Sequence, residues 1–258
     1  MADEAAPAAV AIIAADNPGA ADSSTSTPAD AAAVRLTVFG ATGSLGAELV
    51  RQALAAGHSV SVLVRSAEKL ARVLGEHDIP NCQKAQLTTI EGDALNDADV
   101  AKVMGSCGHV LFALGNTTSA TENLCTDATR LVMSHLGDTK RRFIFCSGGS
   151  TAMEGDVVSF GVRFVRWWAA TFMAKSHRDK ENQMALLHSA EGQACEWFGV
   201  RPLQMGQPSV SQVHTGCYRL GYLPFNGMSK ISFADCADAM LTMLTEDTWQ
   251  HQAPIVQY

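Results

Sequence analysis

The chain has 258 residues with a formal net charge of -7, and 47% of them are hydrophobic. This acidic balance, without any run of lysine or arginine, argues against a nucleic-acid-binding protein. The seven cysteines form no Cys-x-x-Cys pair and stand mostly in apolar segments. We therefore expect them to be small core residues of a reducing, cytoplasmic compartment, and we expect no metal site.

The first 33 residues differ from the rest of the chain. Alanine dominates them, a Ser/Thr run occupies residues 23–27, and no basic residue occurs before Arg35. This composition is unlike a secretory signal or an Arg-rich presequence, and the apolar run at 10–13 is too short to cross a membrane. We expect a disordered tail over residues 1–33 and a single α/β domain over residues 34–258.

Residues 34–65 predict a strand, a glycine turn, a helix and a second strand. An apolar run of strand length comes first, and Gly40, Gly43 and Gly46 follow at three-residue spacing. Gly57 then stands where a helix-ending glycine is expected. Gly40 permits a sharp turn, Gly43 lets a pyrophosphate approach the backbone, and Gly46 lets the helix pack against the sheet. The free N–H groups of the first helical turn would hold the phosphates, so we predict dinucleotide binding.

The end of the second strand indicates which dinucleotide binds. An NAD site usually has Asp or Glu about 20 residues after the glycine turn, where it binds the ribose 2′-hydroxyl. Arg65 stands in that place, and Lys69 follows four residues later. Because paired guanidinium donors suit a 2′-phosphate, we predict NADP(H) as the cofactor. The alternative is that Arg65 is only a solvated residue at the end of a strand.

The rest of the chain alternates strands and helices. We predict strands at 86–91, 109–114, 142–146 and 195–200, and a last strand at the edge of the sheet at 254–258. We predict helices at 66–75, 97–104, 121–136, about 177–189 and 234–244. This alternation predicts a Rossmann-type, doubly wound parallel sheet in a three-layer α/β/α domain, with ligands at the carboxyl ends of the strands. Asp93 lies at one such end, where it could accept a hydrogen bond from adenine or only stabilise a turn.

Residues 156–175 carry apolar side chains on nearly all faces of a predicted helix. Arg163 and Arg166 interrupt the segment, and each would cost about 2.5–3.5 kcal/mol at the centre of a bilayer, so we expect no transmembrane helix. The segment could bury against the domain, close over the active site, or form a dimer, partner or membrane-interface surface.

Six short motifs stand at the predicted strand ends. They are Gly-Ala-Thr-Gly-x-x-Gly at 40–46, Val-Leu-Val-Arg at 62–65, Gly-Asp-Ala-Leu at 92–95, Val-Leu-Phe-Ala-Leu-Gly at 110–115, Phe-Ile-Phe-Cys-Ser at 143–147 and Val-Arg-Pro-Leu-Gln at 200–204. Together they resemble the atypical short-chain dehydrogenase/reductases that bind NAD(P)H, and are most similar to the biliverdin-β/flavin reductases. The resemblance implies an NADPH-dependent reductase that transfers hydride to a planar conjugated acceptor, such as a flavin, a quinone or a biliverdin-like tetrapyrrole.

The resemblance also implies site residues. Ser147 would hold the acceptor or the nicotinamide, and Lys180 would face cofactor or substrate; the alternatives are a turn serine and a surface lysine. The substrate pocket would form from residues 147–180 and 204–232, and Gln204 replaces a histidine of the family. The implied cofactor contacts are Gly40, Thr42, Gly43, Ser44, Leu45, Gly46, Arg65, Lys69, Asp93, Ala94, Leu95, Ala113, Leu114, Gly115, Cys146, Ser147, Pro202, Leu203 and Gln204.

The usual acid of short-chain dehydrogenases, a tyrosine with lysine four residues later, is missing. None of Tyr218, Tyr222 and Tyr258 has a lysine at that spacing, so phenol-based carbonyl chemistry is not expected. Hydride transfer to a flavin or quinone chiefly needs stacking and orientation, which the absence does not affect. The alternative function is a non-catalytic NADP(H)-binding sensor or assembly factor of the NmrA-like type, with the segment at 156–175 as its partner surface.

Overall fold

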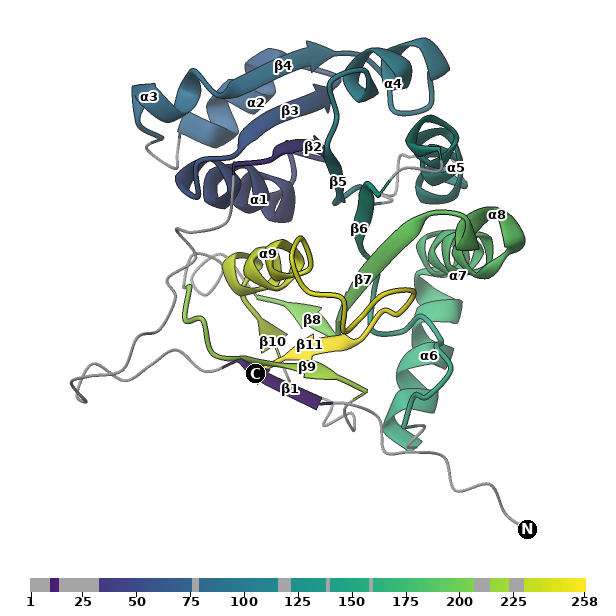
Figure 1. Cartoon of the computed structure of the whole chain (residues 1–258). Coiled ribbons are helices and arrows are strands. Elements are labelled where there is room, and N and C mark those ends of the chain that lie inside the picture. Colours follow the sequence, from purple (N-terminus) through teal and green to yellow (C-terminus); the bar gives the residue numbers. More distant parts are fainter. Residues whose placement is uncertain are drawn as a thin grey trace, which may run out of the picture.

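The computed structural model describes residues 10–13, 33–75, 79–115, 122–137, 140–157, 160–206, 214–222 and 230–258. At its centre is a nine-stranded sheet in the order β1-β9-β11-β7-β6-β5-β2-β3-β4, and β10 and β8 form a two-stranded sheet (Figure 1). The strands are β1 Val10–Ile13, β2 Arg35–Phe39, β3 Ser59–Val64, β4 Leu87–Glu91, β5 His109–Phe112, β6 Arg142–Cys146, β7 Glu196–Pro202, β8 Gln204–Met205, β9 Tyr218–Gly221, β10 Lys230–Ile231 and β11 Ile255–Gln257.

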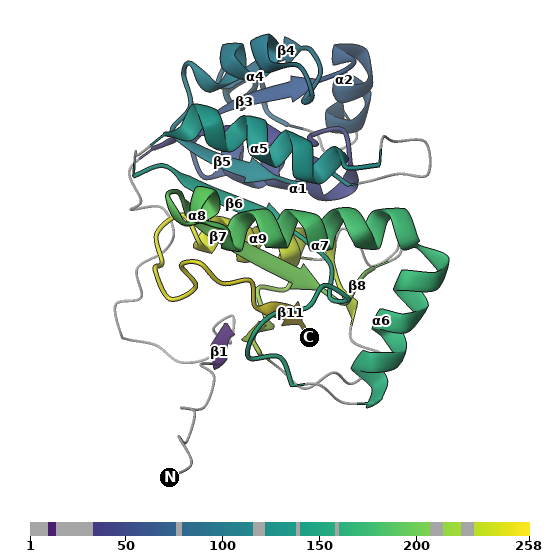
Figure 2. The same ribbon diagram turned by 90° about the vertical axis from the view of Figure 1, so that its right-hand side faces the viewer.

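Helices cover both faces of the large sheet. They are α1 Ser44–Ala55, α2 Ala67–Gly75, α3 Asn81–Lys84, α4 Asp97–Met104, α5 Leu124–Leu136, α6 Phe160–Phe172, α7 Ala174–His188, α8 Ala190–Gln193 and α9 Phe233–Thr242. α1 packs against α9 on one face, and α5 packs against α4 and α7 on the other (Figure 2). The predicted three-layer, Rossmann-type α/β/α fold is confirmed.

The parallel part of the sheet runs from β4 to β11. Its inner strands are buried on both faces, whereas the residues of β4 are half-buried or exposed. In β6, Phe143 and Phe145 face α5 and α7, while Ile144 faces α1 and α9. Burial on both faces explains why consecutive residues of this strand are all apolar. The ring centroids of Phe143 and Phe112 of β5 lie 5.3 Å apart in a tilted arrangement, and those of Phe145 and Trp197 of β7 lie 6.0 Å apart. The carboxyl ends of these parallel strands lie on the same side of the sheet, where the predicted site residues follow them.

The far edge of the sheet differs from the prediction. β11, expected at the edge, lies inside the sheet, parallel to β7 and antiparallel to β9. β9 in turn pairs antiparallel with β1, so that residues 10–13 of the tail form a strand. At these four residues the expectation of disorder is corrected, because the backbone of β9 offers them a pairing edge. The rest of the tail lies outside the described residues, apart from residue 33.

The apolar segment at 156–175 is not one helix. α6 ends at Phe172, and α7 starts at Ala174 after a change of direction at Met173 (Figure 2). Helix propensity and apolar content could not reveal this break, because neither glycine nor proline marks it. Most of the other boundaries agree with the prediction to within three residues, and α4 and β6 agree at both ends.

Candidate functional site

The turn between β2 and α1 requires glycine at two of its three positions. Gly40 has a φ of +87°, and a Cβ there would lie 2.5 Å from the carbonyl oxygen of Ala113. A Cβ on Gly46 would lie 2.1 Å from the carbonyl oxygen of Gly40, because α1 passes close over the turn. A Cβ on Gly43 would lie 3.4 Å from that oxygen, an ordinary contact. Internal packing therefore does not demand glycine at position 43.

The first turn of α1 offers free backbone donors. Gly43 is the N-cap residue, no side chain caps the helix, and the first turn carries no acidic residue. Gly43 and Ser44 are exposed, Thr42 is half-buried, and Leu45 and Gly46 are buried. The positive end of the helix dipole therefore opens to the surface at Gly43 and Ser44, which is an arrangement that suits an anion.

Two cations stand at the neighbouring strand end. Arg65 directly follows β3, Lys69 lies in the first turn of α2, and both are exposed. The nearby acid Glu91, at the end of β4, accepts from the backbone N–H of Ala67 at 2.8 Å and so caps α2. Within the described ranges, neither Arg65 nor Lys69 forms an ion pair, so both cations can meet a ligand.

Asp93 takes part in the turn after β4. Its Oδ1 accepts from the N–H of Leu95 at 2.9 Å, and its own N–H donates to Asp99 Oδ2 at 2.9 Å. Asp93 thus stabilises a turn, which is one of the two roles predicted for it; the other is a hydrogen bond to adenine. Ala94 and Leu95 are half-buried against the core, while the Asp93 side chain is exposed to solvent beside them.

The ends of β5 and β6 bring further predicted residues to this edge. Ala113 donates its N–H to Phe39 at 2.9 Å, next to the glycine turn; Leu114 is half-buried and Gly115 is exposed. Cys146 is buried against Cys236 of α9, and the hydrogen bond between the two thiols, together with burial, raises the pKa of Cys236. Cys236 is therefore a neutral thiol packed beneath the strand ends.

A cavity of about 240 Å³ opens beyond the ends of β6 and β7. Four of the predicted residues, Ser147, Lys180, Pro202 and Leu203, meet in its wall, whereas Gln204 is exposed and outside it. Of the predicted pocket, residues 207–213 and 223–229 lie outside the described part of the chain. The full lining is Ser147, Gly148, Gly149, Ser150, Val165, Trp168, Ala169, Met173, Ser176, His177, Lys180, Pro202, Leu203 and Met205.

Ser147 and Lys180 occupy different positions in this cavity. Ser147 is 1% exposed, its N–H donates to Val200 at 2.9 Å, and its Oγ lies 3.2 Å from Thr151 Oγ1. Lys180 is half-buried, and a Cβ on Gly148 would lie 3.2 Å from its Nζ. The ammonium group therefore lies against the loop after β6, while part of the side chain stays exposed.

His177 is a further polar group of the cavity, and it is not among the predicted site residues. Its Nδ1 lies 3.4 Å from Ser150 Oγ, and its Nε2 lies 4.0 Å from Glu181 Oε1. The same carboxylate oxygen accepts from the N–H of Ala152 at 2.9 Å, which ties α7 to the loop after β6. One signal was available, because His177 precedes Lys180 by three residues and therefore shares its helix face.

A buried ion-pair network holds this region in place. Arg201 of β7 is fully buried, and its guanidinium contacts Asp156 at 2.5 Å and 3.0 Å and the carbonyl of Thr151 at 2.6 Å. Arg166 of α6 donates to the same carboxylate at 2.5 Å. Burial alone would raise the pKa of Asp156, but the hydrogen bond and charge of Arg201, together with Arg166, hold that pKa below its usual value. The network fixes α6 beside the cavity.

The tyrosines lie in settings that do not suit a phenol acid. Tyr218 donates to Asp238 at 2.8 Å, and burial with this carboxylate raises the pKa of Tyr218. Tyr258 donates to Asp235 at 2.6 Å, and burial with the bond to Asp235 raises its pKa as well. In the described residues, no cluster of three or more His, Cys, Asp or Glu side chains could hold a metal ion.

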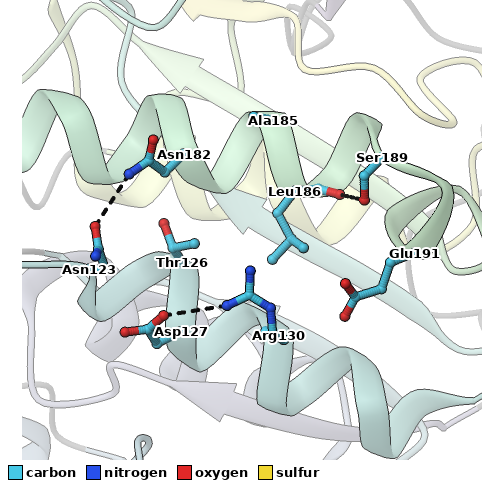
Figure 3. Close-up of a pocket in the computed structure, with 9 residues that line it drawn as sticks. All are labelled: Asn123, Thr126, Asp127, Arg130, Asn182, Ala185, Leu186, Ser189 and Glu191. Atoms are coloured by element: carbon cyan, nitrogen blue, oxygen red, sulfur yellow. Dashed lines mark hydrogen bonds and ion pairs between the residues drawn. The ribbon is translucent and has the colours of Figure 1, made fainter.

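A larger hollow of about 520 Å³ lies elsewhere, between α5 and α7 (Figure 3). Its polar groups contact one another: Asn182 donates to Asn123 at 3.3 Å, and Arg130 pairs with Asp127 at 3.5 Å. None of the predicted site residues lines it. The smaller cavity is the candidate site, because it lies at the carboxyl ends of the strands, where open α/β sheets bind their ligands.

The sheet order and the glycine turn define a Rossmann-type nucleotide-binding protein. The chain belongs to the NAD(P)H-binding family, whose model matches residues 40–247. It is similar in structure to a proposed NADH-flavin reductase from Streptococcus pneumoniae, at 21% identity and a TM-score of 0.64 over 86% of this chain and 98% of that one. An anaerobilin reductase from Escherichia coli O157:H7 aligns at 18% identity and a TM-score of 0.61, over 86% and 96% of the two chains.

A third solved structure was determined with its cofactor. A short-chain dehydrogenase/reductase from Veillonella parvula in complex with NADP is 14% identical and has a TM-score of 0.60, over 87% of this chain and 94% of that one. At these identities the likeness shows the fold. In the part of the chain that the structure describes, no helix is long and apolar enough to cross a membrane.

Proposed function

We propose that the chain is an NADPH-dependent reductase of a planar conjugated acceptor, such as a flavin, a quinone or a biliverdin-like tetrapyrrole. The observation that carries this proposal is the cavity beyond β6 and β7, in which Lys180 and His177 share the walls with Trp168 and Met173. Such a cavity combines apolar and aromatic surface, against which a flat acceptor can stack, with groups that can donate a proton.

The strand-end residues support the assignment of the cofactor. Since internal packing does not explain the glycine at position 43, the open space over it is assigned to the pyrophosphate, held by the N–H groups of α1. Arg65 and Lys69 are assigned to the 2′-phosphate and Asp93 to the adenine amine. Ala113–Gly115 and Pro202–Gln204 are assigned to the nicotinamide half, on the path from the glycine turn to the cavity.

The residues of the cavity would bind and protonate the acceptor. When bound, the reduced nicotinamide supplies a hydride, and the two-electron balance is acceptor + NADPH + H⁺ → reduced acceptor + NADP⁺. Lys180 holds its ammonium group against the loop after β6, and His177 stands one helical turn before it. Either can deliver the proton to an acceptor atom that gains electron density. Ser147, bonded to Thr151, would orient the acceptor or the nicotinamide amide.

NADPH oxidation with a panel of flavin, quinone and biliverdin acceptors tests the proposal. The wild type should oxidise NADPH only in the presence of an acceptor. Lys180→Ala should lower kcat about 10²-fold or more, as expected for removal of a positioned proton donor. The matched control is Lys84→Ala, since Lys84 is an exposed lysine on α3, and it should leave turnover unchanged. Acceptor-dependent turnover equal in wild type and Lys180→Ala would contradict the role of the cavity.

The second candidate is an NADP(H)-binding sensor or assembly factor. The observation that favours it is the solvent-exposed aromatic surface of α6 next to the site, which a partner protein could cover. A sensor binds NADPH without consuming it. Tight NADPH binding with no oxidation across the whole acceptor panel would therefore replace the reductase proposal by this one.

A further inference from the structure

α6 presents a row of aromatic rings to solvent. On the opposite side of the helix, Val162 and Ala169 are buried against the domain. At 100° per residue, the rings of Phe160, Phe164 and Trp167 fall together on the side that faces away from the domain. Trp168 and Phe172 border that side, and Trp168 also lines the candidate cavity. Figure 2 shows α6 standing at one end of the molecule, beyond the first turn of α7. The exposed fractions are 86% for Phe160, 54% for Phe164, 59% for Trp167, 44% for Trp168 and 66% for Phe172.

The helix cannot hide these rings by rolling inward. Arg166 projects from α6 to Asp156, which is in turn held by the fully buried Arg201. Rotation of α6 would break this network and leave a buried charge without its partner, a change that costs several kcal/mol in proteins. The outward aromatic face is thus a fixed property of the fold, and it is a contiguous apolar surface of the kind that marks an interaction site.

The segment that carries this face is basic, whereas the whole chain is acidic. Residues 157–178 contain four Arg or Lys and no Asp or Glu, within a chain whose net charge is -7. Arg163 is exposed and lies three residues after Phe160 and four before Trp167, so it borders both rings on the helix surface. Lys175 and Arg178, in the first turns of α7, are exposed as well; Lys175 forms a solvent-exposed ion pair with Glu122 at 3.8 Å.

We propose that the aromatic face of α6 docks the protein on an anionic lipid bilayer. The rings would sit at the level of the headgroups, where Trp and Phe are favoured, and Arg163, Lys175 and Arg178 would contact lipid phosphates. A helix of 13 residues with cations at its flank lies in the interface without spanning it. This proposal does not rest on the proposed reductase activity.

Two other occupants fit the face less well. A second copy, packed about a two-fold axis on α6, would bring Arg163 of both molecules into one interface, where like charges repel. The N-terminal tail is acidic, but residues 1–33 contain no Phe, Trp or Tyr and are dominated by alanine, so they offer little apolar surface to match five rings. An anionic bilayer satisfies the rings and the cations together.

Vesicle co-sedimentation of the full chain tests the proposal, with phosphatidylcholine vesicles compared with vesicles that also contain phosphatidylserine. The wild type should bind the anionic vesicles and lose affinity as ionic strength rises. Phe164→Ser with Trp167→Ser should weaken binding at least about tenfold, because two half-inserted rings are lost. Arg163→Gln with Lys175→Gln should weaken binding roughly fivefold per cation.

The matched control is Lys84→Gln with Lys102→Gln, which removes two exposed lysines from α3 and α4, away from α6, and should leave vesicle binding unchanged. Equal melting temperatures of all variants confirm that they are folded. Failure of the wild type to bind phosphatidylserine vesicles would overturn the proposal, as would equal binding to both vesicle types. A concentration-dependent dimer in sedimentation velocity, abolished by the Phe164/Trp167 change, would assign the face to a second copy instead.

Discussion

Three glycine-to-alanine substitutions distinguish glycines that the fold of the glycine turn requires from glycines that cofactor binding requires. In Gly46→Ala, the new methyl group would lie 2.1 Å from the carbonyl oxygen of Gly40 and 2.8 Å from Cα of Ala41. Both are backbone atoms that cannot swing aside, so α1 must move off the sheet. Overpacking of this kind costs about 1–3 kcal/mol. For a chain of this size, that corresponds to a melting temperature lower by roughly 2–12 °C.

Gly43→Ala should behave in the opposite way. Its methyl group makes only a 3.4 Å contact, and its φ of -91° suits alanine, so the melting temperature of the free protein should stay within about 1 °C. The methyl group would, however, occupy the space assigned to the pyrophosphate. Losing the backbone donors there should weaken NADPH binding roughly 10- to 100-fold, about 1.4–2.7 kcal/mol.

Differential scanning fluorimetry and NADPH titration followed by nicotinamide fluorescence measure the two effects. Gly75→Ala is the matched control, because none of the described residues lies within 4 Å of its Cβ position at the end of α2. It should leave NADPH affinity unchanged and should not lower the melting temperature. The reasoning would be refuted by a Gly46→Ala protein as stable as the wild type. It would also be refuted by a Gly43→Ala protein that binds NADPH with undiminished affinity.

Three further predictions concern charged residues. Arg65→Ala should weaken NADPH binding about 10-fold or more and NADH binding little, because only NADPH carries the 2′-phosphate; equal losses in titrations of both would contradict the assignment. Lys180→Arg keeps the positive charge but presents a guanidinium that does not release protons, so kcat should fall while KM changes little. An unchanged kcat would argue against proton donation by Lys180. Asp156→Asn leaves Arg201 buried without its carboxylate and should cost about 3–5 kcal/mol in chemical denaturation at pH 7. Because the pKa of Asp156 is lowered in the folded state, the ion pair stabilises the wild type fully above the unfolded-state pKa near 3.9. This stabilisation is lost as the pH falls through the folded-state pKa, so the difference in free energy of unfolding between wild type and Asp156→Asn should shrink in acid. A difference that stays constant with pH would contradict this role.

The parallel half of the fold was predictable from local sequence. Apolar runs of strand length predict β2, β3, β5 and β6, since a strand buried on both faces has little room for polar side chains. Gly40 marks the end of the run at β2, and Ser147 the end of the run at β6. The glycine spacing then places a dinucleotide-binding turn between β2 and α1. These signals are local, and they coincide with the elements that position the cofactor side of the candidate site.

The remaining features depend on contacts distant in sequence. β1 is a strand because β9, more than 200 residues later, presents an unpaired edge to it. The role of Arg201 could not be inferred from its motif, because its partner Asp156 lies 45 residues away and is held there by the fold. The exposure of the α6 rings was likewise hidden, since a helix that is apolar on most faces is usually buried.

The pairing of β1 with β9 has a topological consequence. β1 lies six strand positions from β2, about 29 Å at the usual strand spacing, and the 21 residues between the two strands can reach about 70 Å when extended. The connection is therefore long enough to cross the sheet without tension, and it keeps β1 at a high local concentration beside its partner. A single proteolytic cut within residues 14–32 would remove that advantage and turn β1 from a built-in strand into a dissociable peptide ligand of β9.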